Sequence, residues 1–331
     1  MKAIIPVAGA GTRMRPFTYT QPKALMPIAG KPIISYIVDD LKRVGVSEFI
    51  FIVGYFGDKI VDYIKDNEPD ISAEFVFQNN REGLGHALFL AKEHVNLNEE
   101  ILIALGDSII EVKDDFFNSK KSSIVIKKVK DPRFFGIAEF NEQGVLSKLV
   151  EKPKFPKSNE ALVGWYKIKE TEKLFAILDK YNREDIRTNG EIQFTDVLNE
   201  MLNDGIPFET FVADQWLDVG NGEILIQSNA IMLKKHGGKI SDKATVENCA
   251  IIEPVFIADH CIVKNSIIGP NVTIGSNSVV KNSLLMNGII GNFTQINKLK
   301  LEDFMIGSDS KLKGSTQSLT VGDNTELDFS R

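Results

Sequence analysis

The first residues suited to chemistry form a loop rich in glycine and arginine. Residues 3–8 are apolar and predict a strand, and residues 9–16 then read GAGTRMRP. Glycines let the backbone approach a phosphate chain closely, so that its N–H groups point at the oxygens. Arginine binds phosphate through a forked pair of hydrogen bonds. The pattern predicts a triphosphate-binding loop made of Gly9, Ala10, Gly11, Thr12 and Arg13.

Two other phosphate-binding motifs do not fit this loop. A dinucleotide fingerprint needs a third glycine where Met14 stands, and a P-loop needs Gly-Lys-Ser/Thr, which is absent. Gly9 and Gly11 alone are equally compatible with a tight turn. Lys23, in the downstream segment PKALMP, adds a further cation and favours phosphate binding over the turn.

Two aspartates are candidate metal ligands. Asp107 follows the apolar residues 101–105, and Asp218 lies in the segment WLDVG. Open α/β sheets place ligand-binding groups at the carboxyl ends of strands, and Mg²⁺ binds one or two carboxylates together with phosphate oxygens. Asp107 taken alone suits a helix N-cap equally well. Only the fold can bring the two aspartates together.

The adjacent residues Glu151 and Lys152 carry groups that together can bind a sugar phosphate. The carboxylate can accept hydrogen bonds from sugar hydroxyls, and the ammonium group can bind the phosphate. A Glu-Lys pair considered alone is more often a solvated surface feature.

Composition limits the function classes. A chain of 331 residues favours two domains, and a net charge of −6 without a basic run disfavours nucleic-acid or membrane-surface binding. Cys249 and Cys261 form no CxxC pair, which argues against a zinc site or a disulfide framework. The apolar run at the N-terminus is too short for a signal sequence, and no segment approaches the ~20 apolar residues of a membrane span. We expect a cytoplasmic protein.

Apolar periodicity predicts a mixed α/β domain with a doubly wound, mostly parallel sheet. A β-richer insertion begins near residue 123 and could cover a cleft. The expected strands are residues 3–8, 48–53, 74–78, 101–105, 123–129, 137–140, 147–150 and 162–168. The expected helices are residues 33–44, 59–65, 84–94, 172–180 and 194–203.

The pattern changes after a glycine hinge at residues 236–238. Apolar residues then recur about every six positions, which is typical of the hexapeptide repeats of a left-handed parallel β-helix. Weaker repeats at Ile306 and Val321 predict that this short, irregular solenoid continues almost to the end. Because a solenoid leaves open faces, we expect homo-oligomerisation through it. The repeat positions are Ile240, Val246, Ile252, Ile257, Val263, Ile268, Ile274, Val280, Leu285, Ile290 and Ile296.

The motifs together resemble the sugar nucleotidyltransferase, or NDP-sugar pyrophosphorylase, family. GAGTRMRP, PKALMP and GKP look like its nucleotide-binding signature, and LGD, DPRFFG, EKP, GEIQFTD and WLDVG follow in the family's order. The resemblance covers roughly residues 1–230, and many members carry a hexapeptide solenoid. It implies a catalytic domain over residues 1–236, a β-helix domain over residues 237–331, and Mg²⁺ as cofactor.

The resemblance also implies roles for individual residues. The substrates would be a nucleoside triphosphate and a sugar 1-phosphate, and the catalytic cations Arg13, Lys23 and Lys152. The glycine loop would hold the triphosphate, Gln78 and Gly83 would contact the base, and Asp107 and Asp218 would bind Mg²⁺. The sugar phosphate would lie against Gly136, Glu151, Lys152, Gly164 and Glu191.

Substrate choice and rival functions stay open in the sequence. Residues 83–88, GLGHAL, resemble bacterial UTP–glucose-1-phosphate uridylyltransferases, whereas residues 314–323 resemble the longer glucose-1-phosphate thymidylyltransferases. A pyrimidine triphosphate and glucose 1-phosphate are therefore favoured, and a mannose-1-phosphate guanylyltransferase is the nearest rival. A non-catalytic regulatory subunit would normally lack some of the four residues Arg13, Lys23, Asp107 and Asp218. An acyl-transferring solenoid would need a longer, regular repeat and a catalytic histidine.

Overall fold

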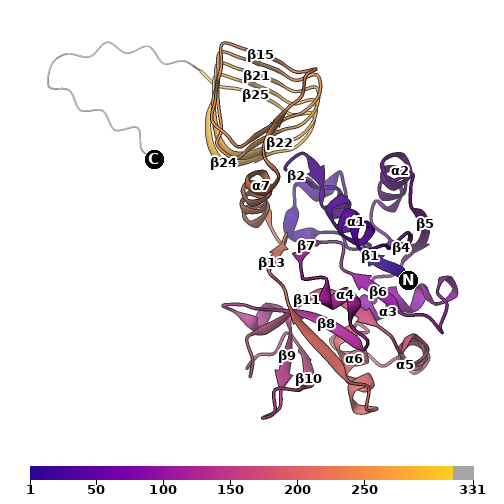
Figure 1. The fold of residues 1–331 in the computed structure, drawn as a ribbon. Coiled ribbons are helices and arrows are strands. Elements are labelled where there is room, and N and C mark those ends of the chain that lie inside the picture. Colours follow the sequence, from indigo (N-terminus) through magenta and orange to yellow (C-terminus); the bar gives the residue numbers. More distant parts are fainter. Residues whose placement is uncertain (316–331) are drawn as a thin grey trace. The chain divides into compact units, whose positions relative to one another are not determined.

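The computed structural model describes residues 1–315, and the chain divides into two compact units. The first unit is Met1–Ser228, and the second begins at Asn229 (Figure 1). The predicted division near residue 236 stays a prediction. Each unit has its own apolar core, and the two are described separately.

A mixed sheet forms the centre of the first unit, as the sequence predicts. Strands β6, β1, β4 and β5 lie side by side and are parallel, whereas β11 joins β6 in the antiparallel direction. Strands β9 and β10 extend the sheet beyond β11, and β8 and β12 also attach there. The bounds are β1 (Lys2–Pro6), β4 (Glu48–Val53), β5 (Ser72–Phe77), β6 (Ile101–Ala104), β8 (Ser122–Lys128), β9 (Gly136–Phe140), β10 (Leu146–Glu151), β11 (Glu160–Ile168) and β12 (Phe208–Val212).

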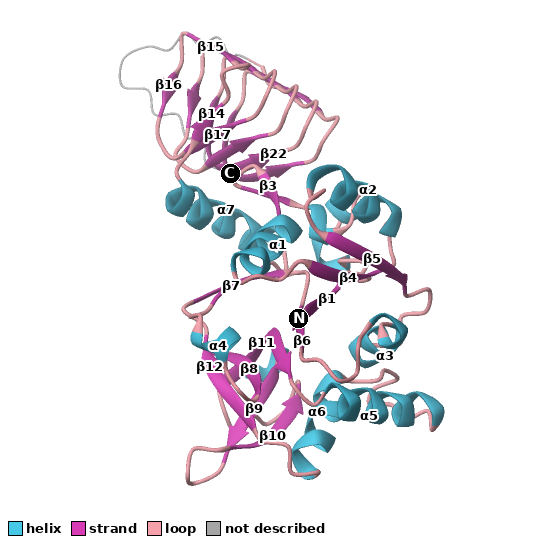
Figure 2. Cartoon of the chain, turned by 45° about the vertical axis from the view of Figure 1, so that its right-hand side comes forward, coloured by secondary structure: helices cyan, strands magenta, loops and turns pink. Residues whose placement is uncertain are grey.

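Helices cover both faces of the parallel part of this sheet (Figure 2). The spacing of apolar residues explains why these segments form helices with one buried side. In α1, for example, the apolar residues recur at three- and four-residue intervals, and all of them are buried. On one face Leu88, Leu178 and Leu198 contribute to the same core as Ile4 and Ile50. The helices are α1 (Ile33–Arg43), α2 (Gly57–Asn67), α3 (Leu84–Leu90), α4 (Asp115–Asn118), α5 (Thr171–Arg183) and α6 (Phe194–Asn203).

Some elements differ from the sequence-based expectation. The helix expected over residues 84–94 ends at Leu90, and Lys92–His94 form a separate 3₁₀ turn. The short strands β7 (Ser108–Glu111) and β13 (Gln215–Asp218) were not anticipated, because four residues carry little periodic signal. The helix α7 (Gly222–His236) was also not anticipated, and its weak amphipathic pattern explains why.

The second unit is a parallel β-helix, which agrees with the predicted left-handed hexapeptide solenoid. Successive coils stack in register, so that Val246 pairs with Val263, Val263 with Val280, Val280 with Ile296, and Ile296 with Leu312. Three full hexapeptides would need 18 residues per coil, but the earlier coils have 17 and the later ones 16, which accounts for the five-residue steps in the repeat. The strands are β14 (Lys239–Ile240), β15 (Thr245–Glu247), β16 (Ala250–Ile251), β17 (Val255–Ile257), β18 (Ile262–Lys264), β19 (Ile267–Ile268), β20 (Val272–Ile274), β21 (Val279–Lys281), β22 (Leu284–Ile290), β23 (Gln295–Asn297), β24 (Lys300–Ile306) and β25 (Lys311–Lys313).

Most repeat positions face the core of the β-helix, but two do not. Ile252 is 46% exposed because β16 ends one residue earlier, and Ile251 pairs with the buried Ile268 in its place. Ile240 is 39% exposed in the first short strand of the solenoid. Val321, the last predicted repeat, lies outside the described residues.

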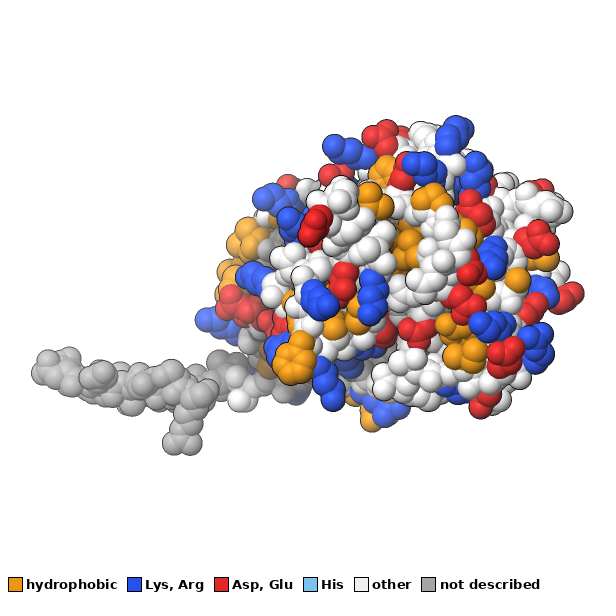
Figure 3. All heavy atoms as spheres, turned by 90° about the horizontal axis from the view of Figure 1, so that it is seen from below, with side chains coloured by type: hydrophobic (Ala, Val, Ile, Leu, Met, Phe, Trp, Pro, Cys, Tyr) orange, Lys and Arg blue, Asp and Glu red, His pale blue; other side chains and the backbone are white. Residues whose placement is uncertain are grey.

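Across residues 1–315 no helix is both long and apolar enough to cross a membrane. On the face shown in Figure 3, acidic and basic side chains are interspersed rather than separated.

Candidate active site

The glycine loop after β1 is shaped by Gly11. Its φ of +59° lies in the left-handed region, and its carbonyl oxygen accepts hydrogen bonds from Thr18 Oγ1 and from the backbone N of Met14, each at 2.8 Å. A Cβ at Gly11 would lie 3.1 Å from the side chains of both Thr18 and Lys23. A larger residue would therefore be strained and crowded there. This turn places Arg13 and Lys23 beside each other at the carboxyl end of β1.

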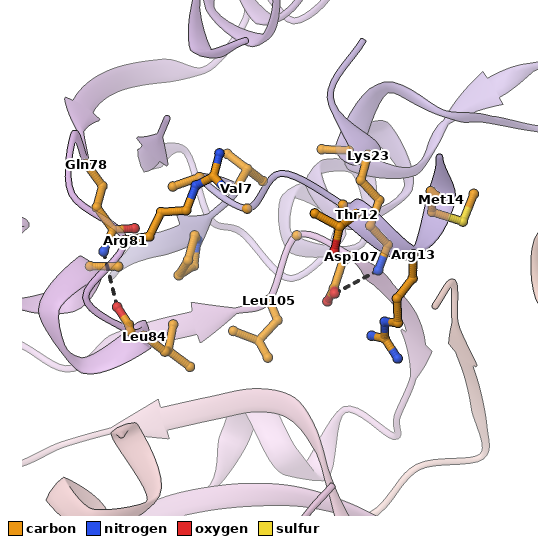
Figure 4. A pocket seen from close by; sticks show the side chains of 18 of the residues that line it. Val7, Thr12, Arg13, Met14, Lys23, Gln78, Arg81, Leu84, Leu105 and Asp107 are labelled. Atoms are coloured by element: carbon orange, nitrogen blue, oxygen red, sulfur yellow. Dashed lines mark hydrogen bonds and ion pairs between the residues drawn. The ribbon is translucent and has the colours of Figure 1, made fainter. Parts of the chain in front are cut away.

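A first cavity of about 460 Å³ opens over this loop (Figure 4). In the figure Arg13, Lys23 and Asp107 lie together on one side, and Gln78 and Arg81 lie on the other. Ala10 is buried and does not line the cavity. All the other predicted nucleotide-binding residues do: Gly9, Gly11, Thr12, Arg13, Gln78 and Gly83.

A second cavity of about 310 Å³ adjoins the first. The two cavities share Arg13, Asp107 and Glu191 in their walls. The second is also lined by the predicted residues Gly136, Glu151, Lys152 and Asp218. The glycine loop and the Glu-Lys pair therefore line two adjoining cavities that share part of their walls.

Gly164 stands behind the wall of the cleft and does not line either cavity. It lies in β11, where its carbonyl oxygen accepts the backbone N–H of Leu105 at 2.9 Å. A Cβ at this position would come within 2.8 Å of the Leu105 side chain, which lines both cavities. Gly164 thus supports the wall through Leu105.

The pairing of two short strands brings the aspartates together. β13 runs antiparallel to β7, with Asp218 opposite Ser108, the residue after Asp107. Burial raises the pKa of Asp218, and the Asp107 carboxylate raises it further, whereas Lys23 and Arg13 act in the opposite direction. Lys23 Nζ lies 2.8 Å from Asp107 Oδ2. Two carboxylates held near each other favour a bound cation.

The donor set at these aspartates fits Mg²⁺. Residues 1–315 contain no group of three or more His, Cys, Asp or Glu side chains placed to hold a metal ion. A two-carboxylate site leaves most coordination positions to phosphate oxygens and water, which is the usual arrangement for Mg²⁺. It would not suit a structural zinc ion, which needs four nitrogen or sulfur ligands.

Glu151 lines the second cavity and is held there by several contacts. Its Oε2 accepts a hydrogen bond from Thr195 Oγ1 at 3.2 Å, and its Oε1 lies 3.2 Å from Lys152 Nζ. Gly136 stands opposite Glu151 in the β9–β10 ladder, and a Cβ there would lie 3.1 Å from Oε2. The backbone N of Lys152 donates to the carbonyl oxygen of Phe135 at 3.1 Å. The carboxylate is therefore fixed, while the Lys152 side chain is 63% exposed and its ammonium group is paired with Glu151 at the surface of the cavity.

Sequence reasoning missed several residues of the cleft. Arg81 lines the first cavity, with its guanidinium carbon 5.6 Å from the centre of the Tyr55 ring. Trp216 lines the second cavity and packs its ring against the edge of Phe135, with centroids 5.0 Å apart. Trp216 belongs to the WLDVG motif, so the sequence could have indicated it as a site residue. Arg81 belongs to none of the motifs, so nothing in the sequence around it indicates a place in the cavity wall.

A comparison with known protein families decides the classification. The family model described as nucleotidyl transferase matches residues 2–235. The chain belongs to the nucleotidyl transferase family. This family membership accounts for the order of the glycine loop, the two aspartates and the Glu-Lys pair along the first unit.

Individual relatives agree with this membership. The low-salt glycan biosynthesis nucleotidyltransferase Agl11 of Haloferax volcanii is 34% identical over 75% of this chain and 71% of its own length. The bifunctional protein GlmU of Methanococcus maripaludis strain C5 is 35% identical over 99% of this chain and 74% of its own length. A UDP-glucose pyrophosphorylase solved with UDP-glucose superposes with a TM-score of 0.61 at 27% identity, covering 71% of this chain and 98% of that one. The comparisons support sugar-1-phosphate nucleotidyl transfer as the class of reaction.

Proposed function

We propose that this nucleotidyltransferase joins a pyrimidine nucleoside triphosphate, UTP or dTTP, to glucose 1-phosphate and releases pyrophosphate. The observation that carries the proposal is the pair of adjoining cavities that share Arg13 and Asp107. One cavity has the glycine loop and Gln78 for a nucleotide, and the other has Glu151 and Lys152 for a sugar phosphate. Similarity to a structure that contains UDP-glucose supports the choice of base and sugar.

The reaction needs positioning and charge neutralisation more than proton transfer. A phosphate oxygen of the sugar 1-phosphate attacks the α-phosphorus in line. A new P–O bond forms, the bond between the α-phosphorus and its bridging oxygen to the β-phosphate breaks, and pyrophosphate leaves with that oxygen. The nucleophile is already an anion, so no general base is required. The barrier comes largely from bringing two polyanions together, which positioned cations reduce.

The cations of the cleft have distinct tasks in this proposal. Arg13, in both cavity walls, neutralises charge on the triphosphate at the reacting phosphorus. Lys152 holds the sugar phosphate, and Lys23 moves from Asp107 to phosphate oxygens when the cation binds. Asp107 and Asp218 would hold Mg²⁺, which neutralises phosphate charge when bound. Glu151 and Glu191 accept hydrogen bonds from sugar hydroxyls.

Pyrophosphate release tests this proposal. UTP, dTTP, GTP, CTP and ATP are each combined with glucose 1-phosphate or mannose 1-phosphate in Mg²⁺ buffer. The proposal expects the highest rate with UTP or dTTP and glucose 1-phosphate. Release only with GTP and mannose 1-phosphate would establish a mannose-1-phosphate guanylyltransferase instead. No release in any combination would favour a regulatory subunit of the same fold.

Gly136→Ala gives a specific prediction for the sugar side. The new methyl group would stand about 3.1 Å from Glu151 Oε2, which is tighter than ordinary contact, and would turn the carboxylate away from the sugar. We expect KM for glucose 1-phosphate to rise about tenfold, with KM for the triphosphate unchanged. Initial-rate kinetics in both substrates measure this. Equal changes in the two KM values would contradict a sugar-side role.

The solenoid is proposed to form a homo-oligomer in the cytoplasm. Neighbouring strands of one coil expose Ile262, at 37%, and Ile267, at 40%. A second copy of the chain would cover these side chains. We expect light scattering to give a multiple of 36.9 kDa, and the double change Ile262→Asp and Ile267→Asp to reduce it toward that mass. A wild-type protein with the monomer mass would contradict the proposal.

A further inference from the structure

The side-chain amide of Gln78 makes its contacts within the protein through its nitrogen atom. Its Nε2 donates to the main-chain oxygen of Gly83 at 3.1 Å and lies 3.1 Å from Nδ1 of His86. An amide nitrogen has two hydrogens, and both are engaged when the ring proton of His86 is on Nε2, which leaves Nδ1 as an acceptor. Since hydrogen-bond partners determine which way an amide points, these two contacts turn Oε1 away from them and toward the cavity (Figure 4).

Reversing this amide would be unfavourable. A flipped Gln78 would place Oε1 against the main-chain oxygen of Gly83, which can only accept, and against Nδ1 of His86, which is a second acceptor in the tautomer with its proton on Nε2. The side chain is 7% exposed, and its backbone N–H is bonded to the oxygen of Val53 at 2.8 Å. With little water available to satisfy a misplaced group, the reversed orientation would leave buried polar atoms unpaired.

His86 is suited to accept this hydrogen bond. A neutral imidazole with its proton on Nε2 offers a lone pair at Nδ1. Burial lowers the pKa of His86, Glu82 raises it and Arg187 lowers it, and these two charged residues form an ion pair at 2.5 Å. The ring also stacks on Phe89, with centroids 6.3 Å apart, which fixes the plane of the imidazole.

We propose that His86 is a positioning residue that orients Gln78 so that the site selects bases with a ring N–H group. This inference rests on the proposed function, which places the base beside Gln78. Uracil and thymine offer N3–H to Oε1 of Gln78, and guanine offers N1–H. Cytosine and adenine present a lone pair at the equivalent ring nitrogen and would meet the oxygen without a hydrogen bond. A site that presents a hydrogen-bond acceptor therefore discriminates against bases that also present an acceptor at this ring position.

The test is the ratio of kcat/KM for UTP to that for CTP, with glucose 1-phosphate and Mg²⁺. His86→Phe keeps a ring against Phe89 but removes the acceptor, and we expect the ratio to fall about tenfold. The loss should come mainly from a higher KM for UTP, with kcat little changed. His86→Asn is the matched control, because its Oδ1 can take the place of Nδ1, and its ratio should stay close to the wild-type value.

Three results would overturn the inference. One is an unchanged ratio in folded His86→Phe, and another is a wild-type enzyme that uses CTP as well as UTP. The third is a loss of kcat for both nucleotides that His86→Asn does not restore, since that would indicate a purely structural histidine. Should His86→Phe not fold, His86→Met provides the same comparison. Absence of pyrophosphate release by the wild type with any triphosphate would instead remove the proposed function itself, and this inference with it.

Discussion

Replacing Arg13 by lysine should lower kcat/KM by about 10²–10³-fold, although the positive charge is kept. Arg13 lines both cavities. Its guanidinium group lies close to the Asp218 carboxylate, because a Cβ added at Gly220 would stand 3.5 Å from both Arg13 Nη1 and Asp218 Oδ2. A planar guanidinium can bridge two phosphate oxygens at this point, whereas a lysine ammonium forms a single point contact. Steady-state kinetics in both substrates measure the loss.

Arg15 provides the matched control for this substitution. It stands two residues away in the same segment and is exposed like Arg13, but its guanidinium carbon lies 4.9 Å from the centre of the Tyr19 ring and it lines neither cavity. Arg15→Lys should leave kcat/KM within about twofold of the wild type. Similar losses in both variants would show that the segment needs arginine for folding and not for the reaction.

Asp218→Asn should reduce activity by at least about 10²-fold and yet make the metal-free protein more resistant to heat. Burial and the nearby Asp107 raise the pKa of Asp218 above its unfolded value. For an acid, a raised folded pKa means that the ionised form lowers the stability of the native state at neutral pH. A neutral asparagine removes that cost but also removes a ligand for the cation.

Two measurements separate these effects. Thermal unfolding in EDTA should give a higher midpoint for Asp218→Asn than for the wild type, and activity titrated with Mg²⁺ should stay low at every concentration. Asp62→Asn, which changes an exposed carboxylate on α2, should alter neither quantity. A lower midpoint together with normal activity would contradict the metal-ligand role.

The local elements were predictable where periodicity is long and clear. The strand Glu48–Val53 and the helix Phe194–Asn203 occur at the predicted residues, because their apolar spacing alone determines which side is buried. The residue types of the glycine loop also predicted a shared site, and Gly11, Arg13 and Lys23 do line one cavity, while their binding of phosphate stays a prediction.

The parts that could not be predicted depend on contacts between distant segments. Asp107 and Asp218 meet only because the four-residue strand after Asp107 pairs with one that lies about a hundred residues later. The positions of Gly164 behind Leu105 and of Arg81 in the cavity wall likewise follow from tertiary packing. Ile252 faces outward because one coil slips by a residue, which the spacing alone did not show.

The most direct test of the proposed reaction follows the oxygen atoms. Glucose 1-phosphate carrying ¹⁸O in its three non-ester phosphate oxygens is incubated with UTP and Mg²⁺. Mass spectrometry then gives the number of ¹⁸O atoms in each product. Attack by the sugar phosphate on the α-phosphorus predicts UDP-glucose that keeps all three labels and pyrophosphate that has none. Labelled inorganic phosphate, released by cleavage at the sugar carbon, would contradict the account.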